Sequence, residues 1–188
     1  MSRVRIIGMD LETTGFKAED GHRITEFAFT IVDFDGKDFA FKKTINSLVN
    51  PERSIPEVVQ NITGITPKMV ATKKPFSHFA PTLAKLINSA DLVVAHNFDF
   101  DGPFFHHEMT RCGQEFDLDV EDFCTMVNGR FATGTGKVPK LQELCWSLDV
   151  EFNPDDAHRA SYDTEKMMEA FVVACKQGYF QPKCLKSY

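Results

Sequence analysis

Two carboxylates near the N-terminus are the first residues whose types and spacing suggest chemistry. Asp10 and Glu12 follow the apolar run Val4–Met9, which predicts a buried strand. Side chains of an extended strand alternate between its faces, so residues two positions apart point the same way. Two like charges about 4 Å apart repel by about 4 kcal/mol at an effective dielectric constant of about 20. We therefore expect a cation between them or a proton on one, although a solvated strand end would also tolerate the pair.

A second acidic cluster is the segment 96–101, HNFDFD. It follows the short apolar run Asp91–His96, which predicts a buried strand, and a helix is expected over Asp101–Cys112. Asp99 and Asp101 compete for a functional role, one on either side of Phe100 in the sequence. Either carboxylate has a structural alternative as a helix cap or as a charge that compensates the helix dipole.

A third cluster places His158 five residues before Asp163, where a long helix is expected over Ser161–Gln177. An acid in the first turn of a helix also compensates the dipole, and a lone loop histidine is usually solvated. The same spacing nevertheless lets both side chains reach one cleft from a loop-to-helix junction.

The elements around these clusters predict an α/β fold. Strands are expected first, and helices then alternate with short apolar strands, a pattern typical of a mixed sheet covered by helices. Active sites of such sheets collect at strand ends, which is where the acidic residues fall. The further expected strands are Arg23–Asp33, Phe39–Val49 after an Asp35-Gly36 turn, and part of the ambiguous segment Asp117–Thr125; the further helices are a short one from Pro67, Pro75–Ser89 and Pro139–Leu148.

Composition excludes some classes of protein. The 188 residues include 21 Lys and Arg against 27 Asp and Glu, so bulk charge does not favour nucleic acid, although metal ions can supply local positive charge. The five cysteines form no C-x-x-C pair, which favours reduced thiols in an intracellular, cytoplasmic protein. No apolar run approaches the roughly 20 residues of a membrane span, and the early strand leaves no room for a signal peptide, so no membrane partner is expected.

Together the three clusters resemble the motifs of the DEDD 3′→5′ exonucleases, in the histidine-bearing subgroup of this proofreading-type, ribonuclease-H-like superfamily. The segment 10–15 (DLETTG) matches the first motif, 96–101 the second and 158–163 (HRASYD) the third. The second match assigns the catalytic role to Asp101 over Asp99. The resemblance covers roughly residues 5–175, and it departs from the family where Cys124-Thr125 replaces a frequent Asp-Thr pair.

The resemblance implies a mixed five-stranded sheet, with the second strand antiparallel and helices on its faces. It also implies two divalent ions, Mg²⁺ or Mn²⁺, because such a pair stabilises the attacking and leaving oxygens of phosphodiester hydrolysis. Asp10 is expected to bridge the ions, Glu12 and Asp163 to hold the one that activates water, and Asp101 to anchor the other. His158 is expected to act as the general base.

The family also implies a site for the terminal nucleotide. Leu11, Thr13 and Thr14 are expected to meet the 3′ end, Ile65 and Phe100 to pack against terminal bases, and Asn97 to lie close by. The expected substrate is the 3′ end of single-stranded nucleic acid, with DNA favoured over RNA, and the products are nucleoside 5′-monophosphates. The glycine-rich, basic segment 129–140 is either a mobile loop that touches the substrate backbone or a solvated connector.

Domain boundaries and two rival functions stay open at this point. Residues 1–178 are expected to form the exonuclease domain, and residues 179–188 a frayed tail. One rival is a nucleic-acid-binding or scaffold protein with an idle site, which the presence of all five catalytic positions disfavours. The other is a proofreading subunit bound to a polymerase or a DNA-repair partner. The short tail disfavours this rival and favours a free-standing enzyme.

Overall fold

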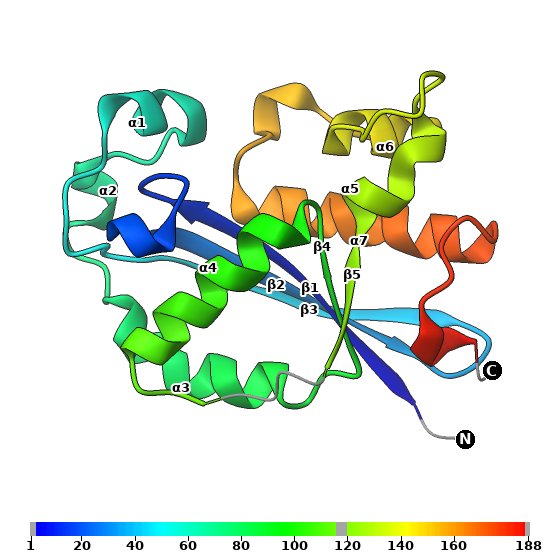
Figure 1. Ribbon diagram of the computed structural model, residues 1–188, viewed down its shortest axis with the longest axis horizontal. Coiled ribbons are helices and arrows are strands. Elements are labelled where there is room, and N and C mark those ends of the chain that lie inside the picture. The colour runs from blue at the N-terminus through cyan, green and yellow to red at the C-terminus, as the bar shows by residue number, and fades with distance from the viewer. Residues whose placement is uncertain (1–2, 116–119, 187–188) are drawn as a thin grey trace.

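A five-stranded sheet forms the centre of the computed structural model, which describes residues 3–115 and 120–186 (Figure 1). The strands stand in the order β3-β2-β1-β4-β5, and β2 is the strand that runs antiparallel to its neighbours. Their bounds are β1 Val4–Thr13, β2 Ile24–Phe34, β3 Phe39–Leu48, β4 Leu92–Ala95 and β5 Glu121–Cys124. The structure confirms the expected mixed α/β sheet with an antiparallel second strand.

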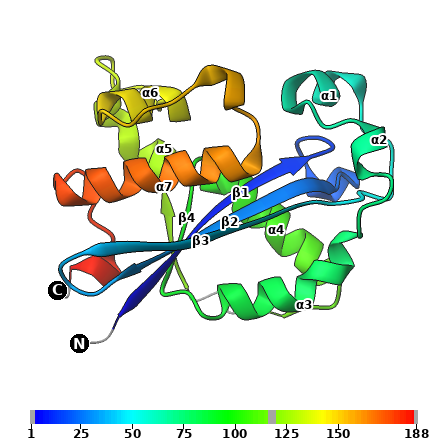
Figure 2. The ribbon, with the colours of Figure 1, turned by 180° about the vertical axis from the view of Figure 1, so that it is seen from behind.

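Helices cover both faces of this sheet, as Figure 1 and the reverse view in Figure 2 show. The helices α3 (Phe76–Ile87) and α4 (Phe98–Arg111) lie on one face, and α7 (Ala160–Lys176) lies on the other, where α6 (Leu141–Ser147) packs against it. The shorter elements are α1 Glu57–Thr63, α2 Pro67–Val70, α5 Thr125–Asn128 and the 3₁₀ turns at Ala18–Asp20, Gly129–Ala132, Pro154–Asp156 and Lys183–Leu185.

Side chains along β1 point alternately to the two faces of the sheet. Ile7 and Met9 pack in the hydrophobic cluster under α3 and α4, whereas Ile6 packs in the cluster under α7. Gly8 lies on the α7 side, where an added Cβ would overlap the side chain of Met168. The missing side chain therefore lets α7 approach β1 closely, just before the acidic end of the strand.

Two element boundaries differ from the sequence prediction by three residues or more. β1 continues past Met9 to Thr13, because residues 10–13 remain in the antiparallel ladder with β2, with a bulge between Glu12 and Thr13. The helix α4 begins at Phe98 and not at Asp101, so both competing aspartates lie in its first turn. The ambiguous segment resolves into β5 followed by α5, and its residues 117–119 lie outside the described residues.

The prediction of a frayed tail is wrong for the described residues 179–186. Phe180 is buried, with its ring 5.0 Å from the ring of Phe123. The backbone N–H groups of Lys183 and Cys184 donate to the carboxylate of Glu121 over 2.7 and 2.8 Å. This segment therefore closes one end of the core, and the proposed domain boundary at residue 178 stays a prediction.

Two further expectations concern reduced cysteines and the absence of a membrane span. All five cysteines are free thiols, and burial is the largest cause that raises the pKa of Cys145, Cys175 and Cys184 to about 12. Within the described ranges, no helix has the length and apolar character needed to cross a membrane.

Candidate active site

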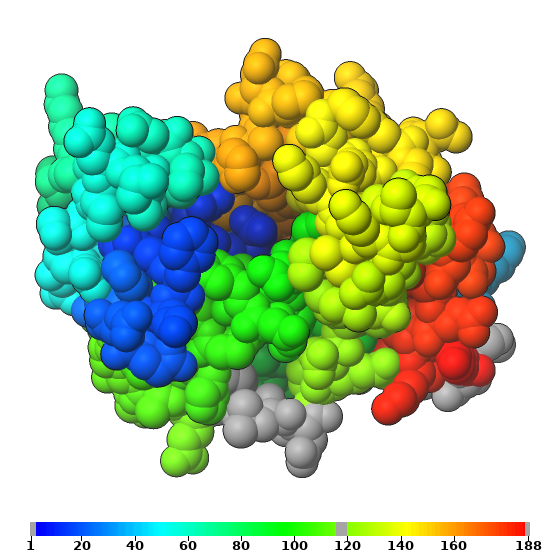
Figure 3. All heavy atoms as spheres, turned by 45° about the horizontal axis from the view of Figure 1, so that its top comes forward, coloured from blue at the N-terminus to red at the C-terminus, as the bar shows by residue number. Residues whose placement is uncertain are grey.

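The carboxyl-terminal end of β1 lies at the bottom of a hollow in the molecular surface. Figure 3 shows this hollow between α1 on one side and the α6 region on the other, with β1 at its floor, α4 along its lower edge and the segment that leads into α7 along its upper edge. Asp10 and Glu12 lie on the face of β1 that is covered by α7, and Asp163 lies in the first turn of that helix. The strand, α4 and α7 thus deliver their acidic residues to one place.

The contacts of these residues show how closely they gather. Asp101, which is 3% exposed, accepts a hydrogen bond at Oδ1 from the backbone N–H of Leu11 over 3.1 Å, and so lies against β1. Glu12, His158 and Asp163 present ligand atoms that all lie within 4.8 Å of one another. We call Asp10, Glu12, Asp101 and Asp163 the acidic cluster. Asp99, by contrast, is exposed.

Burial and mutual repulsion raise the pKa values of the acidic cluster. At Glu12 burial is the largest cause, and the charges of Asp10 and Asp163 add to it, so that the pKa reaches about 10. Burial also raises the pKa of Asp163 to about 6, although the backbone N–H of His158 donates to Asp163 Oδ2 over 2.9 Å and opposes the rise. Both carboxylates therefore hold protons more tightly in the fold than in the unfolded chain.

The same causes act on the two remaining members. Burial, followed by the charges of Asp163 and Glu26, raises the pKa of Asp10 well above its ordinary value. Burial and the charge of Asp10 do the same at Asp101, where the Leu11 N–H acts in the opposite direction. Burial and mutual repulsion thus oppose ionisation at every member of the cluster.

Glu26 is a residue whose importance the sequence analysis missed. It is fully buried on β2, directly opposite Glu12 in the ladder, and its carboxylate accepts two hydrogen bonds from the Arg159 guanidinium, over 2.8 and 3.2 Å. The backbone N–H of Ala160 also donates to it over 3.2 Å. Glu26 thus ties the first turn of α7 to the sheet. The available signal was an acid near the start of an apolar strand, which a cation partner would explain.

The acidic cluster fits divalent cations with oxygen ligands. In the part of the chain that the structure describes, no Lys or Arg forms an ion pair with any of its members. The Oδ1 atom of Asp163 is buried and has no hydrogen-bond partner among the described residues. Carboxylate oxygens are the ligands that Mg²⁺ and Mn²⁺ prefer, so the donor set matches these ions.

We expect the metal-free protein to lose stability as the pH rises from about 4 to about 6. The folded protein holds the Asp163 proton up to a pKa of about 6, against an ordinary value of 3.8, so the unfolded state binds fewer protons in this window. This difference corresponds to about 3 kcal/mol of unfolding free energy, which Asp163→Asn should remove. Urea unfolding of both proteins in EDTA across this pH range measures the effect.

Added Mg²⁺ serves as the control for that measurement. A cation that binds the ionised cluster should stabilise the wild-type protein more at pH 8 than at pH 5, because protons compete with the ion at the lower pH. Wild-type and Asp163→Asn curves that run parallel in EDTA would contradict the assignment of the raised pKa to Asp163.

Three predicted substrate-binding residues lie on and just after the end of β1. The side chains of Leu11, Thr13 and Thr14 are buried. The Thr13 hydroxyl donates to the Gly15 carbonyl over 2.6 Å, and the Thr14 hydroxyl accepts from the Arg23 N–H over 3.0 Å. Since both hydroxyls form hydrogen bonds within the turn, the backbone groups of this segment are the ones available for a contact with substrate.

The structure leaves Ile65 no exposed surface with which to pack against a terminal base. Its side chain packs in a small cluster with Ile55 and Val70. The apolar side chains that this region exposes are Val58 and Ile62 on α1, at 65% and 51%. The hollow is therefore flanked by a different isoleucine, three residues earlier in the chain.

Asn97 and Phe100 lie at the start of α4. Asn97 adopts a left-handed backbone conformation, with φ of 80°, and precedes the first residue of the helix. Phe100 is partly exposed and lines, together with Phe16, a groove of about 420 Å³ between α4 and the loop after β1. Phe16 is 82% exposed. An aromatic ring thus stands on either side of this groove.

The glycine-rich segment 129–140 is held by hydrogen bonds. The Arg130 guanidinium donates to the Gly136 carbonyl over 2.9 Å, and the Thr133 hydroxyl donates to the Lys137 carbonyl over 2.7 Å. The Pro139 carbonyl accepts from Nε2 of His96, whose pKa burial lowers to about 4. The neutral His96 ring therefore ties the end of this segment to β4.

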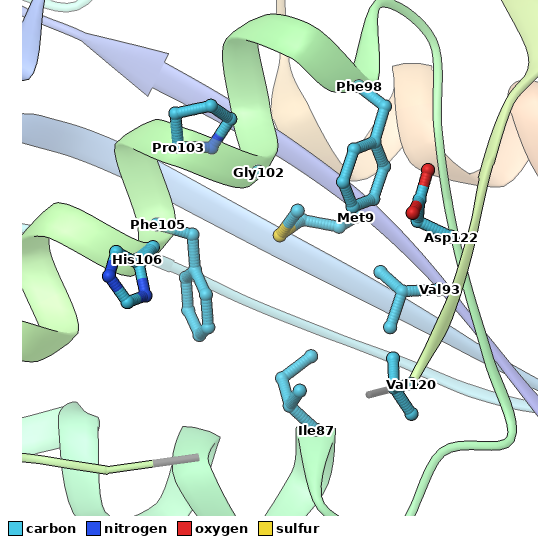
Figure 4. Close-up of a pocket in the computed structure, with 10 residues that line it drawn as sticks. All are labelled: Met9, Ile87, Val93, Phe98, Gly102, Pro103, Phe105, His106, Val120 and Asp122. Carbon is cyan, nitrogen blue, oxygen red and sulfur yellow. The ribbon is translucent and has the colours of Figure 1, made fainter. Parts of the chain in front are cut away.

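An apolar cavity of about 380 Å³ lies on the other face of the sheet (Figure 4). Met9 of β1 and Phe98 and Phe105 of α4 line it, and Asp122 is the carboxylate among its described lining residues. Met9 and its neighbour Asp10 point to opposite faces of β1, so the sheet separates the cavity from the acidic cluster.

The mixed sheet and the acidic cluster at its strand ends define a nuclease of the ribonuclease-H-like class with the DEDD residue pattern. The chain belongs to the exonuclease family RNase_T, whose family model matches residues 7–171. The expected resemblance is therefore confirmed.

Curated relatives carry names from DNA processing. DNA polymerase III subunit epsilon of Treponema pallidum is 34% identical over 172 residues, which cover 90% of this chain and 76% of the relative. The 3′-5′ exonuclease DinG of Bacillus subtilis is 32% identical over 165 residues, 88% of this chain. The chain spans only 17% of the length of DinG.

Solved structures share the fold. Exonuclease X, in a complex with 5′ overhanging duplex DNA, aligns with a TM-score of 0.68 and 24% identity over 97% of this chain and 98% of its own. Escherichia coli exonuclease I, in a complex with a dA16 oligonucleotide, aligns with a TM-score of 0.75 and 17% identity over 92% of this chain and 41% of its own.

Proposed function

We propose that this chain is a metal-dependent 3′→5′ exonuclease that removes nucleoside 5′-monophosphates from the 3′ ends of single-stranded nucleic acid, with DNA as the favoured substrate. The observation that carries the proposal is the acidic cluster, four buried or half-buried carboxylates without a basic partner among the described residues, beside His158. The names of the relatives, a 3′-5′ exonuclease and polymerase III epsilon subunits, support the direction and the preference for DNA.

Asp10, Glu12, Asp101 and Asp163 would hold two divalent ions, Mg²⁺ or Mn²⁺. When bound, such a pair supplies positive charge that stabilises the attacking and leaving oxygens of an in-line displacement at phosphorus. The pKa values of these carboxylates explain why ions are needed, since without them the cluster retains protons near neutral pH. Glu26 and Arg159 position the cluster by holding the first turn of α7 on β2.

His158 is the proposed general base. A water oxygen bonds to the terminal phosphorus, the P–O3′ bond breaks, and the proton of the water passes to the imidazole. The 3′-oxygen leaves on the shortened strand and takes up a proton, and a nucleoside 5′-monophosphate is released. His158 is exposed in the loop before α7, and a nitrogen of its ring lies within 4.8 Å of carboxylate oxygens of Glu12 and Asp163.

The exposed apolar residues around the hollow would hold the terminal nucleotides. Ile62 and Val58 of α1 take the place that the sequence analysis gave to Ile65, while Phe16 and Phe100 offer rings on which a base can stack. Contacts of Leu11, Thr13 and Thr14 with the 3′ end would use their backbone groups.

Matched DNA and RNA oligonucleotides with a label at the 5′ end test the proposal. With Mg²⁺ or Mn²⁺, we expect a ladder of labelled products that shorten one nucleotide at a time, and no products in EDTA. A labelled mononucleotide as the first product would show digestion from the 5′ end and contradict the proposed direction. An inactive protein that still binds the oligonucleotides would favour the idle-site alternative.

We expect Asp101→Asn to reduce turnover severely and Asp99→Asn to change it little. In the structure Asp101 is buried against β1, whereas Asp99 is exposed two residues earlier in the first turn of α4, on nearly the opposite side of the helix. Steady-state rates of the two variants on one labelled oligonucleotide compare the residues directly. A larger loss for Asp99→Asn would overturn the assignment of the second motif.

A polymerase-bound proofreading role is a second candidate. Several relatives at 30–34% identity are named as polymerase III epsilon subunits, and the chain covers 71–76% of their lengths. Co-migration of this chain with a purified replicative polymerase in gel filtration would test that role separately from hydrolysis.

A further inference from the structure

Charge is distributed unevenly along this acidic chain. Residues 39–90 contain seven Lys or Arg and two Asp or Glu, whereas the rest of the sequence contains 14 and 25. The basic stretch includes β3 and α3, neither of which contains an acidic residue. The basic residues are therefore concentrated in one stretch of an otherwise acidic sequence.

The structure gathers part of this charge around one groove. A groove of about 770 Å³, here called the basic groove, lies between β3, the start of β1 and α3. Five cations line it, and Asp33 is the acid among its described lining residues; the cations are Arg3, Arg5, Lys42, Lys43 and Lys85. They come from three elements that are distant in the sequence, so local composition alone does not explain the cluster.

A β-bulge brings two neighbouring lysines to the same groove. The register between β2 and β3 shifts between Ile31 and Val32, so that Ile31 pairs with Lys43 and Val32 with Phe41, and Lys42 is the extra residue. Lys43 shares the face of its partner Ile31, and Lys42 Nζ lies 3.9 Å from Asp33 on the same side. A regular strand would have sent one of the two lysines to the opposite face.

Asp33 holds only some of these cations. It is 4% exposed and forms ion pairs with Arg3 and Arg5 over 3.3 and 3.4 Å, in addition to Lys42. Lys43 and Lys85 are exposed and form no ion pair with any described residue. Five cations thus face one acid within the basic groove; Lys42 and Lys43 also line a neighbouring groove, which contains Glu165 and Glu169.

Lysines on an edge strand also discourage pairing with other strands, and β3 is an edge of this sheet. That role does not account for Arg5, which lies on the central strand β1, or for Lys85, which lies on α3. The floor between the cations is aliphatic and offers no ring for base stacking; it includes Ile31, Ile45, Leu83 and Leu86. The groove is therefore suited to a phosphate backbone more than to bases.

We infer that the basic groove binds the phosphate backbone of a nucleic-acid strand, at a place separate from the acidic cluster. The inference rests on the proposed function in one respect, that the strand is also the substrate. Arg5 precedes Asp10 by five residues of β1, so the two side chains point to opposite faces of the sheet. A bound strand must pass around the edge of the sheet, over a path longer than the roughly 17 Å between the two residues along β1. Only strands long enough to span this distance reach both places.

A triple variant, Lys42→Gln/Lys43→Gln/Lys85→Gln, tests the inference. Binding is measured in EDTA by fluorescence anisotropy, with labelled dT oligonucleotides of about 30 and about 5 nucleotides. Affinity for the long strand should fall about 10- to 100-fold near 0.1 M salt, and the salt dependence of log K should weaken by about 2, as expected when up to three phosphate contacts are lost. Affinity for the short strand and its hydrolysis with Mg²⁺ should stay unchanged.

The matched control replaces three lysines around a different groove, Lys37, Lys176 and Lys186, where Asp35 and Asp38 flank Lys37. It removes the same charge and should leave long-strand affinity unchanged. Equal losses in both variants, or equal losses for long and short strands, would overturn the inference. So would binding of poly-glutamate to the wild-type groove without any loss of oligonucleotide affinity in the triple variant, which would assign the groove to an acidic protein. Hydrolysis that is absent from the wild type would instead contradict the proposed function.

Discussion

Asp10→Asn should abolish hydrolysis, with a loss of at least about 10³-fold in turnover, and should stabilise the metal-free protein. Asp10 lies at the centre of the acidic cluster, where its charge contributes to the raised pKa values of both Glu12 and Asp101. Its removal takes away a metal ligand and a source of repulsion together. Activity and stability should therefore change in opposite directions, which simple misfolding cannot produce.

Thermal unfolding in EDTA and calorimetric titration with Mn²⁺ measure the two effects. Each kcal/mol gained should raise the unfolding temperature by about 2–4 °C for a domain of this size. Asp38→Asn is a suitable control, because Asp38 is exposed in the turn between β2 and β3 and has no predicted role in the site. Near-normal turnover of Asp10→Asn at saturating Mg²⁺ would refute the proposed site.

His158→Asn should lower turnover by about 10²–10⁴-fold, the usual contribution of a general base, while metal affinity changes little. Asparagine tolerates the left-handed backbone at this position, with φ of +64°, so the substitution removes the imidazole without straining the loop. The acidic limb of the pH–rate profile should flatten in the variant.

The proximity of His158 to Glu12 and Asp163, within 4.8 Å, also allows it to act as a metal ligand. Metal affinity decides between the roles, because a water activated by a metal ion titrates in the same range as histidine. If His158→Asn loses Mn²⁺ affinity in step with turnover, it is a ligand and not the base. His78→Asn provides the control, since His78 is an exposed histidine on α3.

Sequence periodicity predicted the existence and type of most elements, but not the ends of those that build the site. Apolar alternation stops at Met9, yet β1 continues to Thr13 because β2 supplies partners for the polar residues. Asp101 was expected to open its helix, whereas α4 begins three residues earlier. Local propensity carries no information about such pairing, which depends on tertiary contacts.

The sequence predicted the site residues that belong to a motif. It did not predict the residues whose exposure depends on how the chain packs. The three motifs identified the acidic cluster and His158, and the structure brings them together. Ile65 and Ile62 are both isoleucines in one short segment, and only the direction of α1 shows that the first is buried and the second exposed. The burial of Glu26 is explained by its ion pair with Arg159, a residue 133 positions away that the sequence alone does not pair with it.

The single strand β1 carries Arg5 at one end and Asp10 near the other; both residues pair with β2, and β4 pairs with Ile6–Gly8 between them. The strand therefore keeps the basic groove and the acidic cluster at a fixed separation. A substrate that is shortened from its 3′ end would lose contact with the groove while the carboxylates still hold it. Digestion would then pass from a processive stage on long strands to a distributive stage on short ones, with the change set by the rigid spacing within β1.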